Sequence, residues 1–217
     1  MTARIVQDDV DGRAVAVATL RSGGVVALPT DTVYGIAVAL DTAGGIARLF
    51  QVKRRPPDKG IVLLLDDAPQ AGSIGVMGAA ATALTTAFWS GGLTVVVQRR
   101  PDVALPAALT GGAETIGLRV PDHSTPRTLA LGVGPMPTTS ANVSGVPEAR
   151  DAAEILEQLG EGIDLILDGG PAHGGPASTV VDCTGERPVV LREGAIPVAR
   201  LVAILDAAGI DHDLAGG

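Results

Sequence analysis

The stretch VVALPTDTVYGIAVAL, residues 25–40, gives the clearest indication of the fold. Its first four residues, Val25 to Leu28, form a short apolar run that predicts a buried strand. The polar segment Pro29-Thr30-Asp31-Thr32 follows, and a second extended stretch is predicted from Val33 to Leu40. Polar side chains therefore gather at the end of a strand. A turn whose hydroxyls bond their own backbone is the simpler interpretation of that segment, and a ligand site is the alternative.

Helices and short strands alternate along the rest of the chain. The apolar periodicity and the positions of glycine and proline predict helices over 11–20, 42–51, 77–89, 124–131, 151–159 and 197–208. Short apolar runs predict strands over 61–65, 93–99, 116–120, 165–167, 179–182 and 189–192, with one more leading into 137–142. This alternation predicts an α/β fold, one domain over residues 1–217, with a twisted mixed sheet. The order of the strands is left open.

Composition excludes several classes of protein. Of the 217 residues 46% are hydrophobic and 18% charged, so the chain can bury a core, and disorder is excluded. Cys183 is the single cysteine, which excludes an intramolecular disulfide and a zinc site built from several cysteines. No apolar run is long enough for a membrane span, and the N-terminal residues are too charged for a signal peptide. We expect a soluble, cytoplasmic protein with no membrane contact.

The charge of the chain is uneven. The formal net charge is −8, which is unusual for a protein that binds nucleic acid without sequence preference. Yet the segment 53–59 holds Lys53, Arg54, Arg55 and Lys59. If the segment is extended, Lys53 and Arg55 point to the same side, and an anion such as phosphate between them would relieve their repulsion. A solvated loop is the equal alternative.

Two further regions carry polar residues after strands. The segment 138–145, TTSANVSG, offers hydroxyls, an amide and loop N–H groups that could cradle a phosphate or a ribose, or form a plain turn. The other region combines D-G-G at 168–170, S-T-V-V-D at 178–182 and L-R-E-G at 191–194. Its glycines allow close backbone approach, and Arg192 ends a predicted strand where an anion could lie.

Together these motifs resemble the YrdC-like family of threonylcarbamoyl-AMP synthases, which act in tRNA modification. The motifs P-T-D-T-V-Y-G, K-x-R-P, G-L-R-V-P-D-H, T-S-A-N-V-S-G, D-G-G, S-T-V-V-D and L-R-E-G occur here in the family's order, between Gly23 and Gly194. The resemblance implies an open twisted sheet with flanking helices and a positively charged concave face, and the short form of the family. It implies that L-threonine, bicarbonate and ATP give threonylcarbamoyl-adenylate and pyrophosphate, for N6-threonylcarbamoyladenosine in tRNAs that read codons starting with A.

The resemblance also assigns roles to residues. Lys53 and Arg55 would bind the triphosphate and support catalysis. The other implied ATP contacts are Lys59, Thr115, Ser140, Asn142 and Arg192. The implied threonine contacts are Thr32, Arg119, Thr138 and Ser178. Catalysis by positioning and charge neutralisation needs no strong general base. Mg²⁺ is expected with ATP, without direct protein ligands and with Asp31, Asp168 and Asp182 as outer partners.

One position departs from the family pattern. Members often carry a histidine where this chain has Leu64, so we expect threonine binding to be modest and tightened by ATP. A paralogue that keeps the nucleotide site but uses another substrate is therefore the first alternative. A non-catalytic RNA-binding module is the second, although the acidic charge and the 2% aromatic content argue against it. We expect the product to pass to the transferase machinery that acts on tRNA, with weak or no direct tRNA binding.

Overall fold

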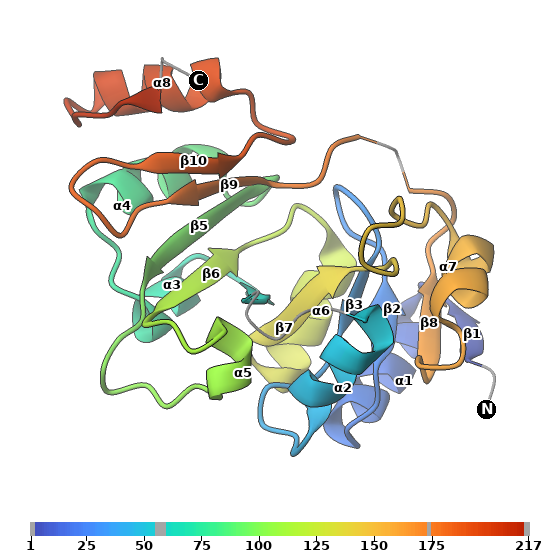
Figure 1. Ribbon diagram of the computed structural model, residues 1–217. Helices are drawn as coiled ribbons and strands as arrows, with labels where there is room; N and C mark the ends of the chain where they lie inside the picture. Colours follow the sequence, from blue (N-terminus) through green and yellow to red (C-terminus); the bar gives the residue numbers. More distant parts are fainter. Residues whose placement is uncertain (1–2, 55–59, 173–174, 215–217) are drawn as a thin grey trace.

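A single mixed β-sheet of ten strands organises the protein, as the computed structural model shows for residues 3–54, 60–172 and 175–214 (Figure 1). The strands are β1 (Arg4–Gln7), β2 (Val26–Leu28), β3 (Gly35–Ala37), β4 (Val62–Leu64), β5 (Leu93–Gln98), β6 (Thr115–Arg119), β7 (Met136–Ser140), β8 (Leu165–Asp168), β9 (Thr179–Asp182) and β10 (Val189–Arg192). Their order across the sheet is β1-β8-β2-β3-β7-β4-β6-β5-β9-β10. Strands distant in sequence therefore become neighbours, and the sheet is open at β1 and β10.

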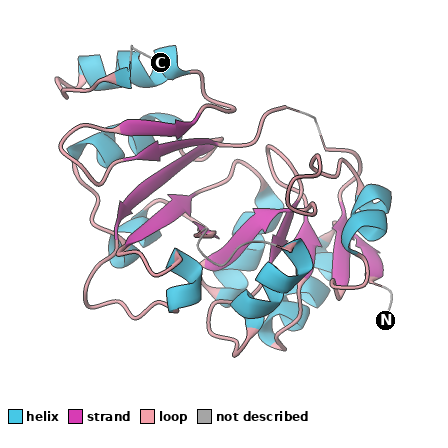
Figure 2. Ribbon diagram, in the orientation of Figure 1, coloured by secondary structure: helices cyan, strands magenta, loops and turns pink. Residues whose placement is uncertain are grey.

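Helices flank this sheet (Figure 2). They are α1 (Val10–Arg21), α2 (Gly45–Lys53), α3 (Pro69–Ile74), α4 (Ala79–Phe88), α5 (Ala107–Thr110), α6 (Ser124–Val133), α7 (Ala152–Leu159) and α8 (Val198–Ala207). Helix α1 packs on α6, and α4 packs on α8. Among the described residues, no helix combines the length and apolar character needed to span a membrane.

Local sequence explains where several helices begin and end. Asp9 caps the start of α1, because its side chain accepts a hydrogen bond from the backbone N–H of Gly12. Asp151 does the same for α7, with Glu154 as donor. Just beyond α1, Gly23 has φ +86°, a left-handed conformation that glycine adopts without steric cost.

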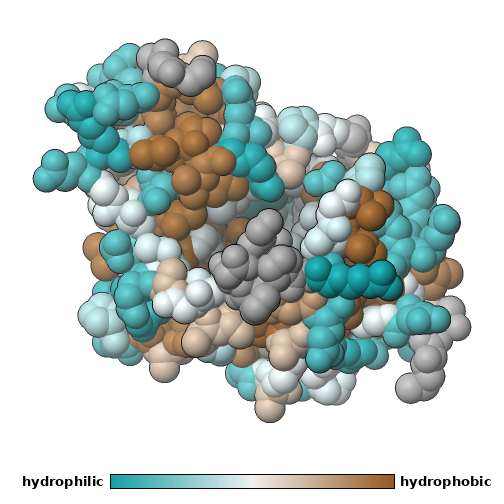
Figure 3. Space-filling view, viewed as in Figure 1, coloured by the Kyte–Doolittle hydropathy of each residue, from teal (hydrophilic) through white to brown (hydrophobic). Residues whose placement is uncertain are grey.

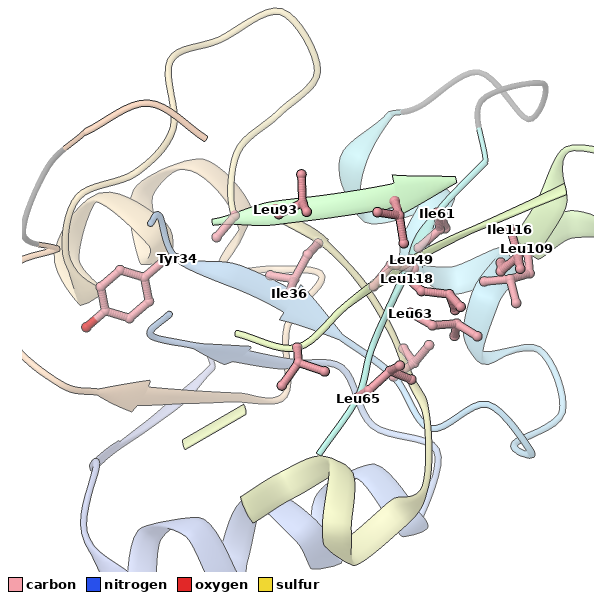
Figure 4. Close-up of a cluster of buried hydrophobic side chains, with 14 of the residues drawn as sticks. Tyr34, Ile36, Leu49, Ile61, Leu63, Leu65, Leu93, Leu109, Ile116 and Leu118 are labelled. Carbon is pink, nitrogen blue, oxygen red and sulfur yellow. The ribbon is translucent and has the colours of Figure 1, made fainter. Parts of the chain in front are cut away.

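Two apolar cores stabilise the sheet. The larger core contains alternate residues of the central strands, such as Leu63, Leu93 and Leu118 (Figure 4). Side chains from α2, α4 and α8 pack with them. The smaller core lies under α1 and α6 and includes Leu129 and Met136. The helices α1 and α6 thus cover only part of one sheet face, the part around β8, β2 and the start of β7.

The open edge at β10 is apolar. Val189 and Leu191 on this strand are exposed, and Figure 3 shows apolar surface gathered over the end of the molecule formed by β10 and α8. Leu191 also reaches the cavity described below.

Most of the predicted elements are confirmed, including the helix over 151–159 and the strands over 93–99 and 116–120. The extended stretch predicted from Val33 to Leu40 contains a strand of only three residues, β3. Three elements were missed, namely β1, α3 and α5, which have four, six and four residues. Elements this short carry too few residues to display a periodic pattern.

Candidate ligand site

A cavity of about 420 Å³ opens on the central strands of the sheet. Its walls contain seven of the predicted site residues: Thr32, Thr115, Arg119, Thr138, Ser140, Ser178 and Arg192. These residues come from five regions that lie apart along the chain, and the order of the strands brings them together. The polar clusters at the strand ends therefore share one site.

The register of the sheet explains why these side chains share a face. Val62 lies opposite both Gly117 and Thr138, and Leu64 lies opposite Arg119. Paired residues on neighbouring strands point to the same side of a sheet. The cavity floor is therefore made of alternate residues: Val62 and Leu64 in β4, Thr94 and Val96 in β5, Thr115, Gly117 and Arg119 in β6, and Thr138 and Ser140 in β7.

Arg119 forms a buried polar corner of the cavity. Its Nη2 donates to Asp31 Oδ1 at 2.5 Å, its Nη1 to Thr32 Oγ1 at 3.1 Å, and its Nε to the carbonyl oxygen of Gly91 at 3.0 Å. Burial lowers the pKa of the Arg119 guanidinium, and the neighbouring Asp31 carboxylate acts in the opposite direction. A guanidinium has five N–H donors, so two are left for a ligand once these bonds are made.

Ser178 and Arg192 form the adjoining wall. Arg192 donates from Nε and Nη2 to the carbonyl oxygen of Ser178, at 3.1 and 2.8 Å, and from Nη2 to Ser178 Oγ at 3.2 Å. The guanidinium of Arg192 has no carboxylate partner among the described residues, so its charge is open to an anion. Close packing holds this wall in place, because a Cβ at Gly194 would collide with the carbonyl oxygen of Ala177.

The segment after β7 is tied to the end of α2. Lys53 is 2% exposed, and its Nζ donates to the carbonyl oxygen of Ser140 at 2.8 Å, to Ser140 Oγ at 3.2 Å and to Asn142 Oδ1 at 2.6 Å. Asn142 in turn donates from Nδ2 to Val146 O at 2.6 Å. Ser140 lines the cavity, and its hydrogen bonds with Lys53 and Asn142 fix its position.

The extended conformation considered for the segment that begins at Lys53 is not present at Lys53 and Arg54. Helix α2 continues to Lys53, and Arg54 follows with φ +49° in a left-handed conformation. Pro56 restricts only the residue before it, Arg55, so it does not prevent α2 from reaching Lys53. Arg55 and Lys59 lie outside the described residues, so their predicted roles stay predictions.

The polar segment 30–32 combines a turn with a site. Thr30 Oγ1 donates to Val33 O at 2.6 Å and accepts from the backbone N–H of Thr32 at 3.1 Å, which is the self-bonded turn considered above. Thr32 and Asp31 also contact Arg119. Tyr34 anchors the segment to the D-G-G motif, because its hydroxyl donates to Gly170 O at 2.6 Å and accepts from Gly169 N at 3.0 Å.

The remaining acidic candidates have structural partners. Asp168 Oδ1 accepts from Gly170 N at 2.9 Å, and Asp182 Oδ1 accepts from the backbone N–H of Thr184 at 2.9 Å and from its hydroxyl at 2.6 Å. Within residues 3–54, 60–172 and 175–214 no group of three or more His, Cys, Asp or Glu side chains is placed to hold a metal ion. The suggested outer-sphere role of these carboxylates stays a prediction.

Sequence reasoning missed Thr94, a buried polar residue of the site. It lies on the cavity face of β5, is 0% exposed, and its Oγ1 is 2.9 Å from Ser178 Oγ. A hydroxyl inside the otherwise apolar run LTVVV was the available signal. Its partner is 84 residues away in the chain, so the contact itself could not be read from the sequence.

Comparison with known proteins identifies the family to which the chain belongs. The family model Sua5_yciO_yrdC, described as telomere recombination, matches residues 18–194. A putative threonylcarbamoyl-AMP synthase of Mycobacterium leprae is 40% identical over 195 residues, which cover 89% of this chain and 88% of that protein. The threonylcarbamoyl-AMP synthase of Bacillus subtilis is 35% identical over 203 residues, 93% of this chain but only 58% of the relative.

A solved structure agrees in fold. The crystal structure of Pyrococcus abyssi Sua5 complexed with L-threonine superposes with a TM-score of 0.87 at 29% identity, over 98% of this chain and 63% of that one. This chain therefore spans less than two thirds of the Bacillus and Pyrococcus proteins and most of the mycobacterial one.

Proposed function

Because this chain belongs to the Sua5/YciO/YrdC family, which its residues 18–194 match, we propose that it is a threonylcarbamoyl-AMP synthase. The proposed reaction joins L-threonine, bicarbonate and ATP into threonylcarbamoyl-adenylate, with release of pyrophosphate. The observation that carries the proposal is the cavity of about 420 Å³, because it unites the T-D-T, G-L-R, S-x-N, S-T-V-V-D and L-R-E-G motifs. Its relatives in Mycobacterium leprae and Bacillus subtilis bear the name of this enzyme.

The amino acid is proposed to bind at the Arg119 corner. A carboxylate there would accept the two N–H donors of Arg119 that the protein leaves unused, in a buried setting where charged hydrogen bonds are strong. Asp31 keeps the charge of the corner balanced when the site holds no carboxylate. Thr32 and Ser178 supply short hydroxyls beside it. Such a corner recognises a small polar amino acid.

ATP is proposed to lie along the rest of the cavity. Ser140 and Thr115 offer hydroxyls, and Arg192 offers an exposed positive charge. Lys53 holds the Ser140 segment, and Arg55 and Lys59 are proposed to add the charge that a triphosphate needs. The positive charge proposed for the concave face would come from these residues. Mg²⁺ would bind the phosphate oxygens of ATP and keep most of its waters, which lowers the negative charge of the phosphates.

The proposed chemistry proceeds in two steps. The threonine amine attacks bicarbonate, and loss of water gives a carbamate. A carbamate oxygen then attacks the α-phosphorus, and pyrophosphate leaves. Because the transition state carries spread negative charge, fixed cations such as Arg192 stabilise it more than a general base would.

The test is mass spectrometry of the products formed from ATP, bicarbonate and single amino acids. Threonine should give the carbamoyl-adenylate and pyrophosphate. A site that bonds the threonine hydroxyl should reject valine by up to ~10⁴-fold, whereas serine should be disfavoured by only about ten- to two-hundredfold. Formation of the valine product at the rate of the threonine product, or of no amino-acid adenylate, would refute the proposal.

Leu64 supports a second candidate function. This side chain is 3% exposed, lies on the cavity face opposite Arg119, and packs in the smaller apolar core beside Met136. It makes that wall of the cavity apolar. A paralogue that adenylates another amine would suit such a wall, and the same product analysis identifies it by the mass of the adduct.

The product is proposed to pass to a transferase that modifies tRNA, with weak or no tRNA binding by this chain. A cytoplasmic location, where ATP, bicarbonate and tRNA meet, belongs to the same proposal.

A further inference from the structure

The hydroxyl of Ser178 has two protein neighbours, and their chemistry limits what it can offer a ligand. A serine hydroxyl has one hydrogen and two lone pairs. Arg192 Nη2 lies 3.2 Å from Ser178 Oγ, and a guanidinium can only donate. Ser178 Oγ therefore accepts one hydrogen bond from Arg192. Thr94 Oγ1 lies 2.9 Å away, and either of these two hydroxyls could be the donor.

The burial of Thr94 decides between the two directions. Thr94 is 0% exposed, and Ser178 Oγ is the one partner that its hydroxyl has in the part of the chain that the structure describes. If Ser178 donated, the Thr94 hydrogen would be buried without an acceptor, which native proteins avoid. Thr94 therefore donates to Ser178. Both lone pairs of Ser178 Oγ are then used, and its own hydrogen is left for the cavity.

The same count of hydrogens and lone pairs gives the hydroxyl of Thr32 the opposite role toward a ligand. Thr30 Oγ1 gives its hydrogen to Val33 O at 2.6 Å, so it must accept in its 3.2 Å contact with Thr32 Oγ1. The hydroxyl of Thr32 thus donates its hydrogen to Thr30 Oγ1, and it accepts a hydrogen bond from Arg119 Nη1 at 3.1 Å. One lone pair of Thr32 Oγ1 is left. Ser178 can only donate to a ligand, and Thr32 can only accept from one.

We propose that Thr94 is a positioning residue that fixes Ser178 as a hydrogen-bond donor toward a carboxylate oxygen of the amino-acid substrate. The amine or hydroxyl of the substrate then faces Thr32, which can accept its hydrogen. Val95 pairs with Leu118 in the antiparallel strands β5 and β6, so Thr94 lies opposite Arg119. The hydroxyl of Ser178, which contacts Thr94, therefore lies near the N–H groups of Arg119. This inference rests on the proposed function, since it concerns the direction in which the amino acid lies.

The test uses Thr94→Val, which keeps the shape and the β-branching but removes the donor. The dissociation constant of L-threonine is measured by calorimetry in the wild type and the variant, both saturated with a non-hydrolysable ATP analogue. We expect Thr94→Val to weaken threonine binding about tenfold. Thr94→Ser restores a donor and should return the dissociation constant to within about threefold of the wild type.

A double-mutant cycle with Ser178→Ala shows whether Thr94 acts through Ser178. In that background Thr94→Val should add almost nothing, because the hydroxyl that it orients is gone. L-threoninol, which lacks the carboxylate, should lose far less affinity than L-threonine on Thr94→Val. Thr85→Val is the matched control: Thr85 is a buried threonine in α4 whose hydroxyl donates to Ala81 O at 2.8 Å, away from the cavity. It should leave threonine binding unchanged.

Unchanged threonine binding by Thr94→Val, an additive effect in the Ser178→Ala background, or equal losses for threoninol and threonine would each overturn the proposal. A wild-type protein that binds the ATP analogue but no amino acid would instead refute the proposed function.

Discussion

Arg119→Met tests how much of the cavity depends on one buried ion pair. The change removes the guanidinium that bonds Asp31, Thr32 and the Gly91 carbonyl, and it leaves the Asp31 carboxylate, which is 14% exposed, without its cation. Breaking a buried pair by removing one partner costs about 3–5 kcal/mol of unfolding free energy. For a chain of this size, that corresponds to a melting temperature lower by roughly 6–20 °C. Threonine binding should be lost in the same variant.

The double variant Arg119→Met/Asp31→Leu separates the structural effect from the ligand effect. It removes both charges, so it should recover most of the lost stability, because paired apolar side chains often replace a buried ion pair at little cost. It should not recover threonine binding, because the carboxylate donors are still absent. The assay is urea unfolding together with calorimetry. If Arg119→Met costs less than about 1 kcal/mol, or if the two single changes add up in the double variant, the ion pair is not the buried, coupled element described here.

Three further expectations follow from the geometry. Gly117→Val should abolish ligand binding with little change in stability. A Cβ at Gly117 makes an ordinary contact 3.4 Å from Val62 Cγ2, and the added methyl groups project into the cavity. Normal ATP affinity of this variant in calorimetry would show that Gly117 does not lie under the ligand. Tyr34→Phe should lower the unfolding free energy by about 1–3 kcal/mol, since Gly170 O and Gly169 N lose their partner; an unchanged urea midpoint would contradict this. Burial raises the pKa of the Cys183 thiol from 9.0 to about 12, so native protein at pH 8 should resist alkylation that the unfolded chain undergoes. Because the folded form holds the thiol proton more tightly, the contribution of Cys183 to stability is full below pH 9 and is lost as the pH rises toward about 12.

The sequence predicted the central strands well because burial on both faces leaves a continuous apolar run. The runs 61–65 and 93–99 are examples, and β4 and β5 lie within them. Strand β1 was missed because its four residues are exposed or half-buried, and its parallel pairing with β8 depends on a strand some 160 residues later. Local patterns carry no information on such a pairing. The order of the strands could not be predicted from the sequence for the same reason.

The candidate site could be predicted as a set of residue types but not as a set of contacts. Thr32, Arg119 and Ser178 were identified from their motifs, and the structure places all three at the cavity. The role of Lys53 as the tie between α2 and the Ser140 segment was not foreseen, because a motif does not tell whether an ammonium faces a ligand or a backbone carbonyl. The geometry of the chain decides that.

The pairing of β9 with β5 has a consequence for synthesis of the protein on the ribosome. Ser178 and Arg192 wall a cavity whose floor strands β4 to β7 are complete once Ser140 has been made. Chains emerge from the N-terminus at about 5–20 residues per second, so for several seconds the floor exists without that wall. During this interval the hydroxyl of Thr94 lacks the partner that Ser178 provides, and the edge of β5 that later pairs with β9 is open. We therefore expect a nascent or truncated chain that ends before Ser178 to bind no amino acid, because Ser178 and Arg192 are both missing from its cavity.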